Sequence, residues 1–143
     1  MPHKYLFTLN ASCKVMNTAY LDVPHKKWGV VVIYNYDTED EQTELLATMR
    51  SFGMTYKDSH RALDILSAYN TGMAISSDDL KMSAIYISKS TSQSQFWDTV
   101  AHELRHVADA IIDYYGVDSY EDAAYLTGHL MKEFVLQVGE PCY

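Results

Sequence analysis

The segment His102-Glu103-Leu104-Arg105-His106 constrains the fold and chemistry of this chain more than any other. In an α-helix, side chains four residues apart lie on one face, so the imidazoles of His102 and His106 can bind the same tetrahedral Zn²⁺. Glu103 follows the first histidine directly, and its carboxylate can take a proton from metal-activated water and later return it to a leaving amine. The segment therefore predicts a helix that holds one Zn²⁺ per chain for hydrolytic chemistry.

The sequence on both sides of this segment favours a helix from about 94 to 115. Ser92 or Ser94 can cap its N-terminus, and Gly116 suits the position after its last turn. At about 100° per residue, most apolar side chains of this helix fall on one side, which is the expected core face. That face contains Trp97, Val100, Leu104, Val107, Ile111, Tyr114 and Tyr115.

The two histidines share the opposite face of this helix with Asp109 and Asp113. Either carboxylate can accept the outer ring N–H of a ligand histidine and fix its tautomer, or it can be an ordinary solvated aspartate. Arg105 points away from the histidine face and is expected to be solvated. The alternative is a surface amphipathic helix with a solvated polar face, but that interpretation offers no reason for the order of His, Glu and His.

The length and charge of the chain limit its architecture and partners. A chain of 143 residues is long enough for one core, so we expect a single domain over residues 1–143. Hydrophobic residues make up 48% of the chain, which is typical of an ordered globular protein. The 19 acidic residues outnumber the 11 basic ones and give a formal charge of −8. This charge disfavours contact with a phosphate backbone, so nucleic acid is not an expected partner.

The sequence also indicates a cellular compartment. Its N-terminal segment has no long apolar run of the kind found in signal peptides, and no window approaches the roughly 18 apolar residues of a membrane span. We therefore expect a cytoplasmic protein with no membrane partner. Cys13 and Cys142 are far apart and form no CxxC pair, so both are expected to be free thiols.

The rest of the chain changes between strand and helix patterns and predicts an α+β fold with a small sheet packed against helices. Trp28 to Tyr36 is nearly continuous in β-branched and aromatic residues, as in a central strand. Ser119 and Asp122 form a capping box for a final helix from about 120 to 137. The other expected elements are a strand over Lys4–Cys13, a helix over 39–52 with a capping box of Thr38 and Glu41, a helix over 57–69, and a hairpin of Met73–Ser76 with Met82–Ser88.

A zinc site built on two histidines needs a third protein ligand. Glu121 lies fifteen residues beyond His106 on the final helix and is the first candidate, although the helix dipole alone also favours a carboxylate there. If the last two helices form a tight antiparallel hairpin, His129 instead lies level with His106. Tyr125 or His129 can also donate a hydrogen bond to a developing oxyanion, although packing or surface exposure is the commoner role for such residues.

The histidine segment and the downstream helix together resemble a known family. His102 to His106, followed by Glu121-Asp122-Ala123-Ala124-Tyr125-Leu126, resembles the gluzincin branch of zinc metallopeptidases. The segment from Ala124 to Gly128 is similar to one in small peptidases that phages and prophages encode. The resemblance covers roughly residues 82 to 135. It implies a zincin-like fold with His102, His106 and Glu121 as zinc ligands and Glu103 as the general base.

From the motif and the resemblance we expect a zinc metallopeptidase that hydrolyses a peptide or protein substrate. The same groups could hydrolyse a non-peptide amide, and a binding module with a structural or vestigial metal site is a further alternative. An open fourth coordination position distinguishes a catalytic zinc from a structural one, which four protein ligands usually close. Substrate specificity and oligomeric state do not follow from the sequence.

Overall fold

The computed structural model describes residues 17–36, 39–69, 71–116 and 120–139, and in the last range it describes the side chains from residue 122 onward. Some expectations from the sequence fall outside the described residues. Among them are the strand over Lys4–Cys13, the state of Cys13 and Cys142, and Ser119 of the capping box before the final helix.

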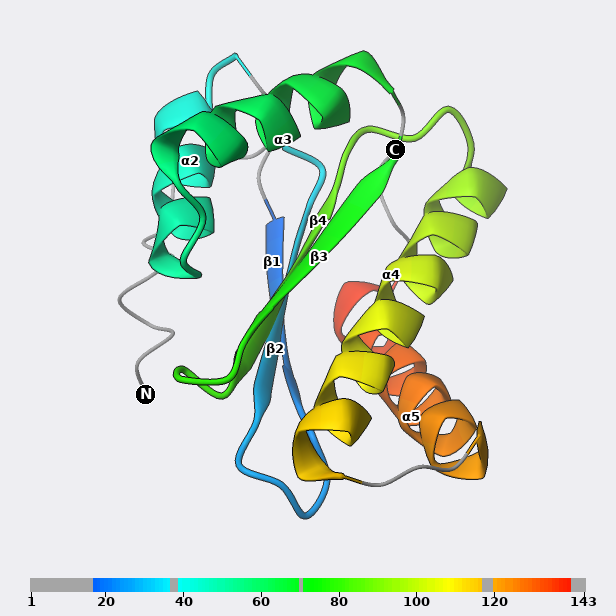
Figure 1. Ribbon diagram of the computed structural model, residues 1–143. Helices are drawn as coiled ribbons and strands as arrows, with labels where there is room; N and C mark the ends of the chain where they lie inside the picture. The colour runs from blue at the N-terminus through cyan, green and yellow to red at the C-terminus, as the bar shows by residue number, and fades with distance from the viewer. Residues whose placement is uncertain (1–16, 37–38, 70, 117–119, 140–143) are drawn as a thin grey trace.

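The described strands form one mixed sheet in the order β1-β2-β4-β3 (Figure 1). The strands are β1 (Asn17–Asp22), β2 (Gly29–Tyr34), β3 (Gly72–Ser77) and β4 (Met82–Ile87). β2 runs parallel to β4, whereas β1 is antiparallel to β2 and β3 is antiparallel to β4. The hairpin expected around residues 73–88 is therefore confirmed, and its first strand lies at one edge of the sheet.

Helices α2 (Gln42–Ser51) and α3 (Tyr56–Ala68) cover one face of the sheet (Figure 1). They confirm the two early helices expected from the sequence. Thr55 caps α3 by accepting a hydrogen bond from the backbone amide of Asp58 at 3.0 Å. α2 begins later than expected, because its N-cap residue is Glu41, whose side chain makes no cap hydrogen bond. Thr38 of the expected capping box lies outside the described residues.

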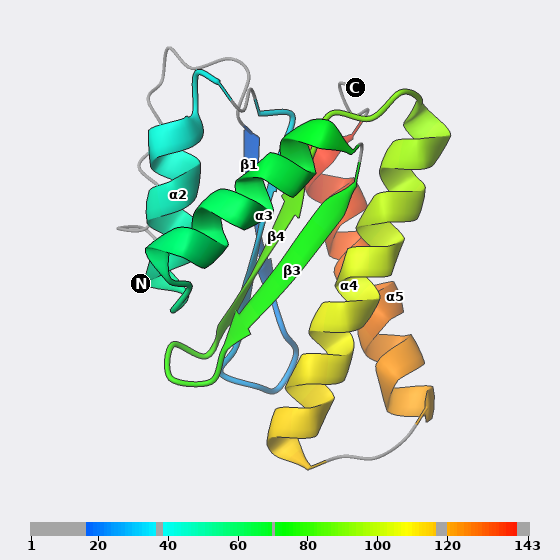
Figure 2. The same ribbon diagram turned by 45° about the horizontal axis from the view of Figure 1, so that its top comes forward.

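Helices α4 (Gln93–Tyr115) and α5 (Tyr120–Val138) cover the opposite face (Figure 2). Ser92, one of the two predicted caps of α4, accepts a hydrogen bond from the backbone amide of Gln95 at 3.1 Å. Gly116 ends α4 with a left-handed φ of 73°, a conformation that suits glycine. Both expected C-terminal helices are thus confirmed. From residue 122 onward, the buried side chains of α5 are Ala123, Leu130 and Phe134.

The central strand β2 is continuously apolar because helices cover both faces of the sheet. Val30 and Val32 belong to the core formed with α4 and α5, whereas Val31 and Ile33 belong to the core formed with α2 and α3. All four side chains are buried. A strand covered on both faces has no polar alternation, so its sequence is a continuous apolar run. The prediction of a central strand is confirmed by this arrangement.

The structure differs from the sequence-based expectation at β1 and at the end of α4. No strand was expected over Asn17–Asp22, but this segment pairs with β2 across a turn that contains Pro24. Tyr114 and Tyr115 were expected in the core, but 38% and 36% of their surfaces are exposed. Both rings instead pack around Trp28 at the C-terminal end of α4, with centroid distances of 5.3 and 6.4 Å.

The described residues therefore form an α+β fold with a small mixed sheet, as the sequence predicts. Among the helices of the described ranges, none is long and apolar enough to cross a membrane.

Candidate functional site

The exposed face of α4 brings the predicted histidine pair together. The Nε2 atoms of His102 and His106 lie 3.1 Å apart. Their rings meet edge to face, with centroids 4.8 Å apart and an interplanar angle of 78°. Both residues are exposed. The spacing of the two histidines thus places two metal-binding nitrogens at one point on the helix surface.

The distance between these nitrogens fits a zinc ion. Two imidazole nitrogens bound to a tetrahedral Zn²⁺ lie about 3.3 Å from each other, given Zn–N bonds of about 2.05 Å. The observed separation of 3.1 Å between His102 Nε2 and His106 Nε2 is close to this value. Both nitrogens are therefore close enough to share one metal ion, and the pair suits two positions of a zinc site.

Glu103 lies at the border between the histidine face and the core. The residue is only 6% exposed, whereas the neighbouring His102 side chain is 66% exposed. Glu103 Oε1 is 4.0 Å from His102 Nε2. Burial raises the pKa of the Glu103 carboxyl above its ordinary value, and the nearby His102 and His106 partly oppose this rise. A carboxylate with a raised pKa is a stronger base than an exposed one, and this one lies directly beside the histidine pair.

The edge strand β3 determines how closely Glu103 can pack. A Cβ atom on Gly72 would lie 2.8 Å from Thr99 Cγ2, 2.9 Å from Glu103 Cγ and 3.2 Å from the backbone oxygen of Tyr86. These distances are shorter than ordinary van der Waals contact, so only a residue without a side chain allows α4 to approach β3 this closely. Gly72 therefore positions Glu103 at the edge of the sheet.

Gly72 was not among the residues that the sequence predicted at the site. Its contact with Thr99 and Glu103 joins residues far apart in the chain, so no local periodicity reports it. The only signal was a glycine at the start of a strand, which can mark a close approach of another segment.

The third ligand remains a prediction. Among the described side chains, no group of three His, Cys, Asp or Glu residues is arranged to hold a metal ion. Glu121 lies in the first turn of α5, but its side chain is outside those that the structure describes. His129 does not join His102 and His106; it lines a separate pocket beside the turn between β1 and β2. Of the predicted site residues, the structure thus brings His102, His106 and Glu103 close together.

The other candidate residues near the site are exposed. Arg105 is solvated, as expected, and its Nε donates a hydrogen bond at 3.0 Å to Oδ1 of Asp109, which is also exposed. Asp113 is exposed further along the helix. Tyr125 is 75% exposed and lines the same pocket as His129, so neither phenol nor imidazole lies against the histidine pair.

Comparison of the chain with protein-family models, curated proteins and solved structures gave no significant match. The chemistry of this site therefore has to follow from the residues that the structure brings together.

We expect the substitution Gly72→Ala to destabilise the fold by about 1–3 kcal/mol, as overpacking of a tight contact usually does. The added methyl group collides with Thr99 and Glu103, so either β3 or α4 must move. Urea unfolding monitored by circular dichroism measures the change in the free energy of unfolding.

Gly128→Ala is the matched control for this prediction. A Cβ atom at Gly128 meets nothing within 4 Å, and the residue lies inside α5. Alanine is the better helix former, so this variant should gain about 1 kcal/mol. Equal effects of the two substitutions would show that the contact at Gly72 is not tight.

The raised pKa of Glu103 predicts a pH-dependent effect of Glu103→Gln on the metal-free protein. Because the folded state binds this proton more tightly than the unfolded chain, the free energy of unfolding falls as pH rises through the interval between the two pKa values. At neutral pH the buried carboxylate is thus unfavourable, and the neutral amide should raise the melting temperature. This rise in melting temperature should become smaller at pH values below the ordinary pKa of glutamate, where the carboxyl group is protonated in both the folded and the unfolded state. Thermal melts in chelator over a pH series test this, and a gain independent of pH contradicts it.

Proposed function

We propose that this chain is a zinc-dependent metallopeptidase with a zincin-like fold. The observation that carries the proposal is the meeting of His102 Nε2 and His106 Nε2 at 3.1 Å, directly beside the buried carboxylate of Glu103. Two neutral imidazoles favour zinc among the common divalent ions, and an adjacent carboxylate supplies the base that hydrolysis needs.

His102, His106 and Glu121 are the proposed metal ligands. The exposure of the histidine pair supports a catalytic centre over a structural one, because a structural zinc is usually enclosed by four protein ligands. When bound, zinc supplies a Lewis acid that lowers the pKa of water and polarises a carbonyl group.

Glu103 is the proposed general base and then the general acid. Its carboxylate accepts one proton from water as the water oxygen attacks the carbonyl carbon of the substrate. The same proton then passes to the amine nitrogen as the carbon–nitrogen bond breaks, so one water is consumed for each bond cleaved. Burial supports this role, because it raises the pKa of the Glu103 carboxyl and so strengthens the base.

The first test of the proposed function is metal binding. We expect native mass spectrometry to show one Zn²⁺ per chain and zinc addition to raise the melting temperature, because ligands from α4 and α5 become linked. Glu121→Ala should weaken zinc binding by more than about a hundredfold, which exceeds the usual loss for an outer partner of a ligand. His129→Ala should leave zinc binding unchanged.

Glu133→Ala is the control for these titrations, because it removes the same kind of side chain from the same helix. It should bind zinc like the parent protein. Loss of zinc in His129→Ala with retention in Glu121→Ala would make this a three-histidine site. A parent protein that takes up no zinc would refute the metal centre altogether.

The second test separates the base from the ligands. Glu103→Gln should keep the zinc ion, because the amide occupies the same volume, but it should lower peptide hydrolysis by about 10²–10⁴-fold, since an amide cannot accept the proton. Cleavage of a mixed peptide library, followed by mass spectrometry, measures this loss.

Glu44→Gln on the distant helix α2 is the matched control and should cleave the library like the parent. Undiminished turnover in Glu103→Gln would remove this residue from the mechanism, and loss of zinc in that variant would make it a ligand. A zinc-loaded parent that cleaves no peptide but hydrolyses other amides would change the substrate class.

A further inference from the structure

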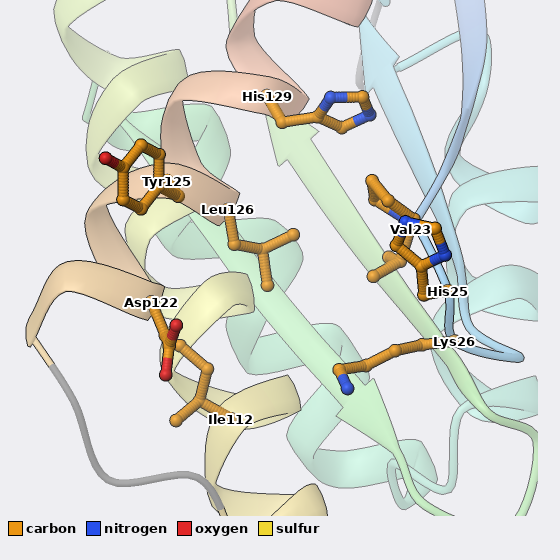
Figure 3. Close-up of a pocket in the computed structure, with 9 residues that line it drawn as sticks. Val23, His25, Lys26, Ile112, Asp122, Tyr125, Leu126 and His129 are labelled. Atoms are coloured by element: carbon orange, nitrogen blue, oxygen red, sulfur yellow. The ribbon is translucent and has the colours of Figure 1, made fainter.

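A pocket of about 500 Å³ lies between α5 and the turn that joins β1 to β2 (Figure 3). Its volume is in the range of small-molecule sites. Neither His102 nor His106 lines it, so it is separate from the proposed metal centre. The lining residues are Val23, Pro24, His25, Lys26, Ile112, Asp122, Tyr125, Leu126 and His129.

The pocket combines an apolar wall with a few polar groups. Val23, Ile112 and Leu126 supply aliphatic surface from three different elements, and Figure 3 shows the side chains of α5 facing those of the turn. Lys26 and His129 add hydrogen-bond donors from opposite sides. An apolar wall with a small number of polar groups is the usual composition of a site for an organic ligand.

The turn holds His25 in an unusual conformation. The amide of Lys26 donates a hydrogen bond to the carbonyl oxygen of Val23 at 3.4 Å, and Pro24 and His25 are the two central residues. His25 has a φ of 60°, the left-handed region that a type II turn requires at this position and that normally favours glycine. The left-handed conformation costs about 1–2 kcal/mol for a residue with a side chain. With histidine at this position the turn presents an imidazole to the pocket, which glycine would not do.

Lys26 is the lysine that lines the pocket. Its Nζ lies 4.5 Å from the ring centroid of Tyr115, a cation–π contact that steadies the ammonium group. Within the part of the chain that the structure describes, no carboxylate forms an ion pair with Lys26. Its hydrogen-bond donors therefore remain available to a ligand.

We propose that this pocket binds a small organic anion with an apolar body and a single negative charge, such as a medium-chain carboxylate. The aliphatic wall takes the apolar body, and Lys26, with His25 and His129 as further donors, takes the charged group. Asp122 lines the same pocket and repels negative charge, so the ligand should carry no more than one negative charge and place it at Lys26. This binding requires neither the proposed hydrolysis nor a bound zinc ion.

Decanoate is the probe for a binding experiment that uses the full chain. Titration followed by amide chemical shifts in two-dimensional NMR should show saturable binding of one molecule. The shifts should concentrate at residues 23–26 and 122–129. Hexanoate should bind more weakly, by about fourfold for each methylene lost from the pocket. Decylammonium should bind more weakly than decanoate, because it cannot pair with Lys26, and inorganic phosphate should not bind, because it has no apolar body.

Separate variants test which residue binds the charged group of the ligand and which part of the pocket binds its apolar body. Lys26→Met should weaken decanoate binding about tenfold, and Lys26→Arg should retain it. The matched control is Lys27→Met, which removes the same charge from the next residue, outside the pocket. Leu126→Trp should fill the pocket and abolish binding, and a dispersed NMR spectrum would show that this variant is folded.

Three results would overturn the proposal. These are chemical shift changes that do not saturate or that spread over the whole chain, equal affinity of Lys26→Met and Lys27→Met, and equal binding of decanoate and decylammonium. All of these measurements can be made on metal-free protein and without peptide hydrolysis, so failure of the pocket and failure of the metal centre can be told apart.

Discussion

The contact between Gly72 of β3 and the first turns of α4 determines where the groups of the candidate site lie. A helix normally packs on a sheet at a distance set by side chains on both surfaces, and the missing side chain of Gly72 lets Thr99 and Glu103 lie against the strand. Because α4 is one continuous helix, this approach also sets the direction in which the side chains of His102 and His106 point. The edge of the sheet and the helix thus define the site together.

The electrostatics of the site follow from this packing. Glu103 loses most of its water when α4 meets the sheet, and an ionised carboxylate without water is unfavourable unless a positive charge lies close. His102 and His106 provide only partial compensation, since the pKa of Glu103 stays raised. A divalent cation on the two imidazoles would favour the ionised form of Glu103 over the protonated one, because a metal ion is often the largest charge in such a site. If the proposed zinc ion binds there, it should therefore stabilise the ionised form of Glu103.

The parts of the fold that could be predicted from the sequence are those encoded by neighbouring residues. The helix of His102 and His106 was predicted with its limits because its periodicity and its caps are local. The central strand was predicted because burial on both faces leaves a continuous apolar run. β1 was missed, since Asn17 and Asp22 at its ends favour turns and only pairing with β2 makes it a strand. Gly72 was missed because its role depends on a helix that follows much later in the chain.

Helix α5 connects the two proposed sites through its first turns. Asp122 and Leu126 line the pocket, and Glu121, the proposed third ligand, directly precedes Asp122. Adjacent helical residues differ in direction by about 100°, so one turn of helix can serve two sites without sharing a side chain. If Glu121 binds zinc, the metal holds this turn against α4, and a ligand in the pocket holds the same turn against the β1–β2 connection. Both events then favour one position of α5, and thermodynamic linkage requires that each strengthen the other by the same factor.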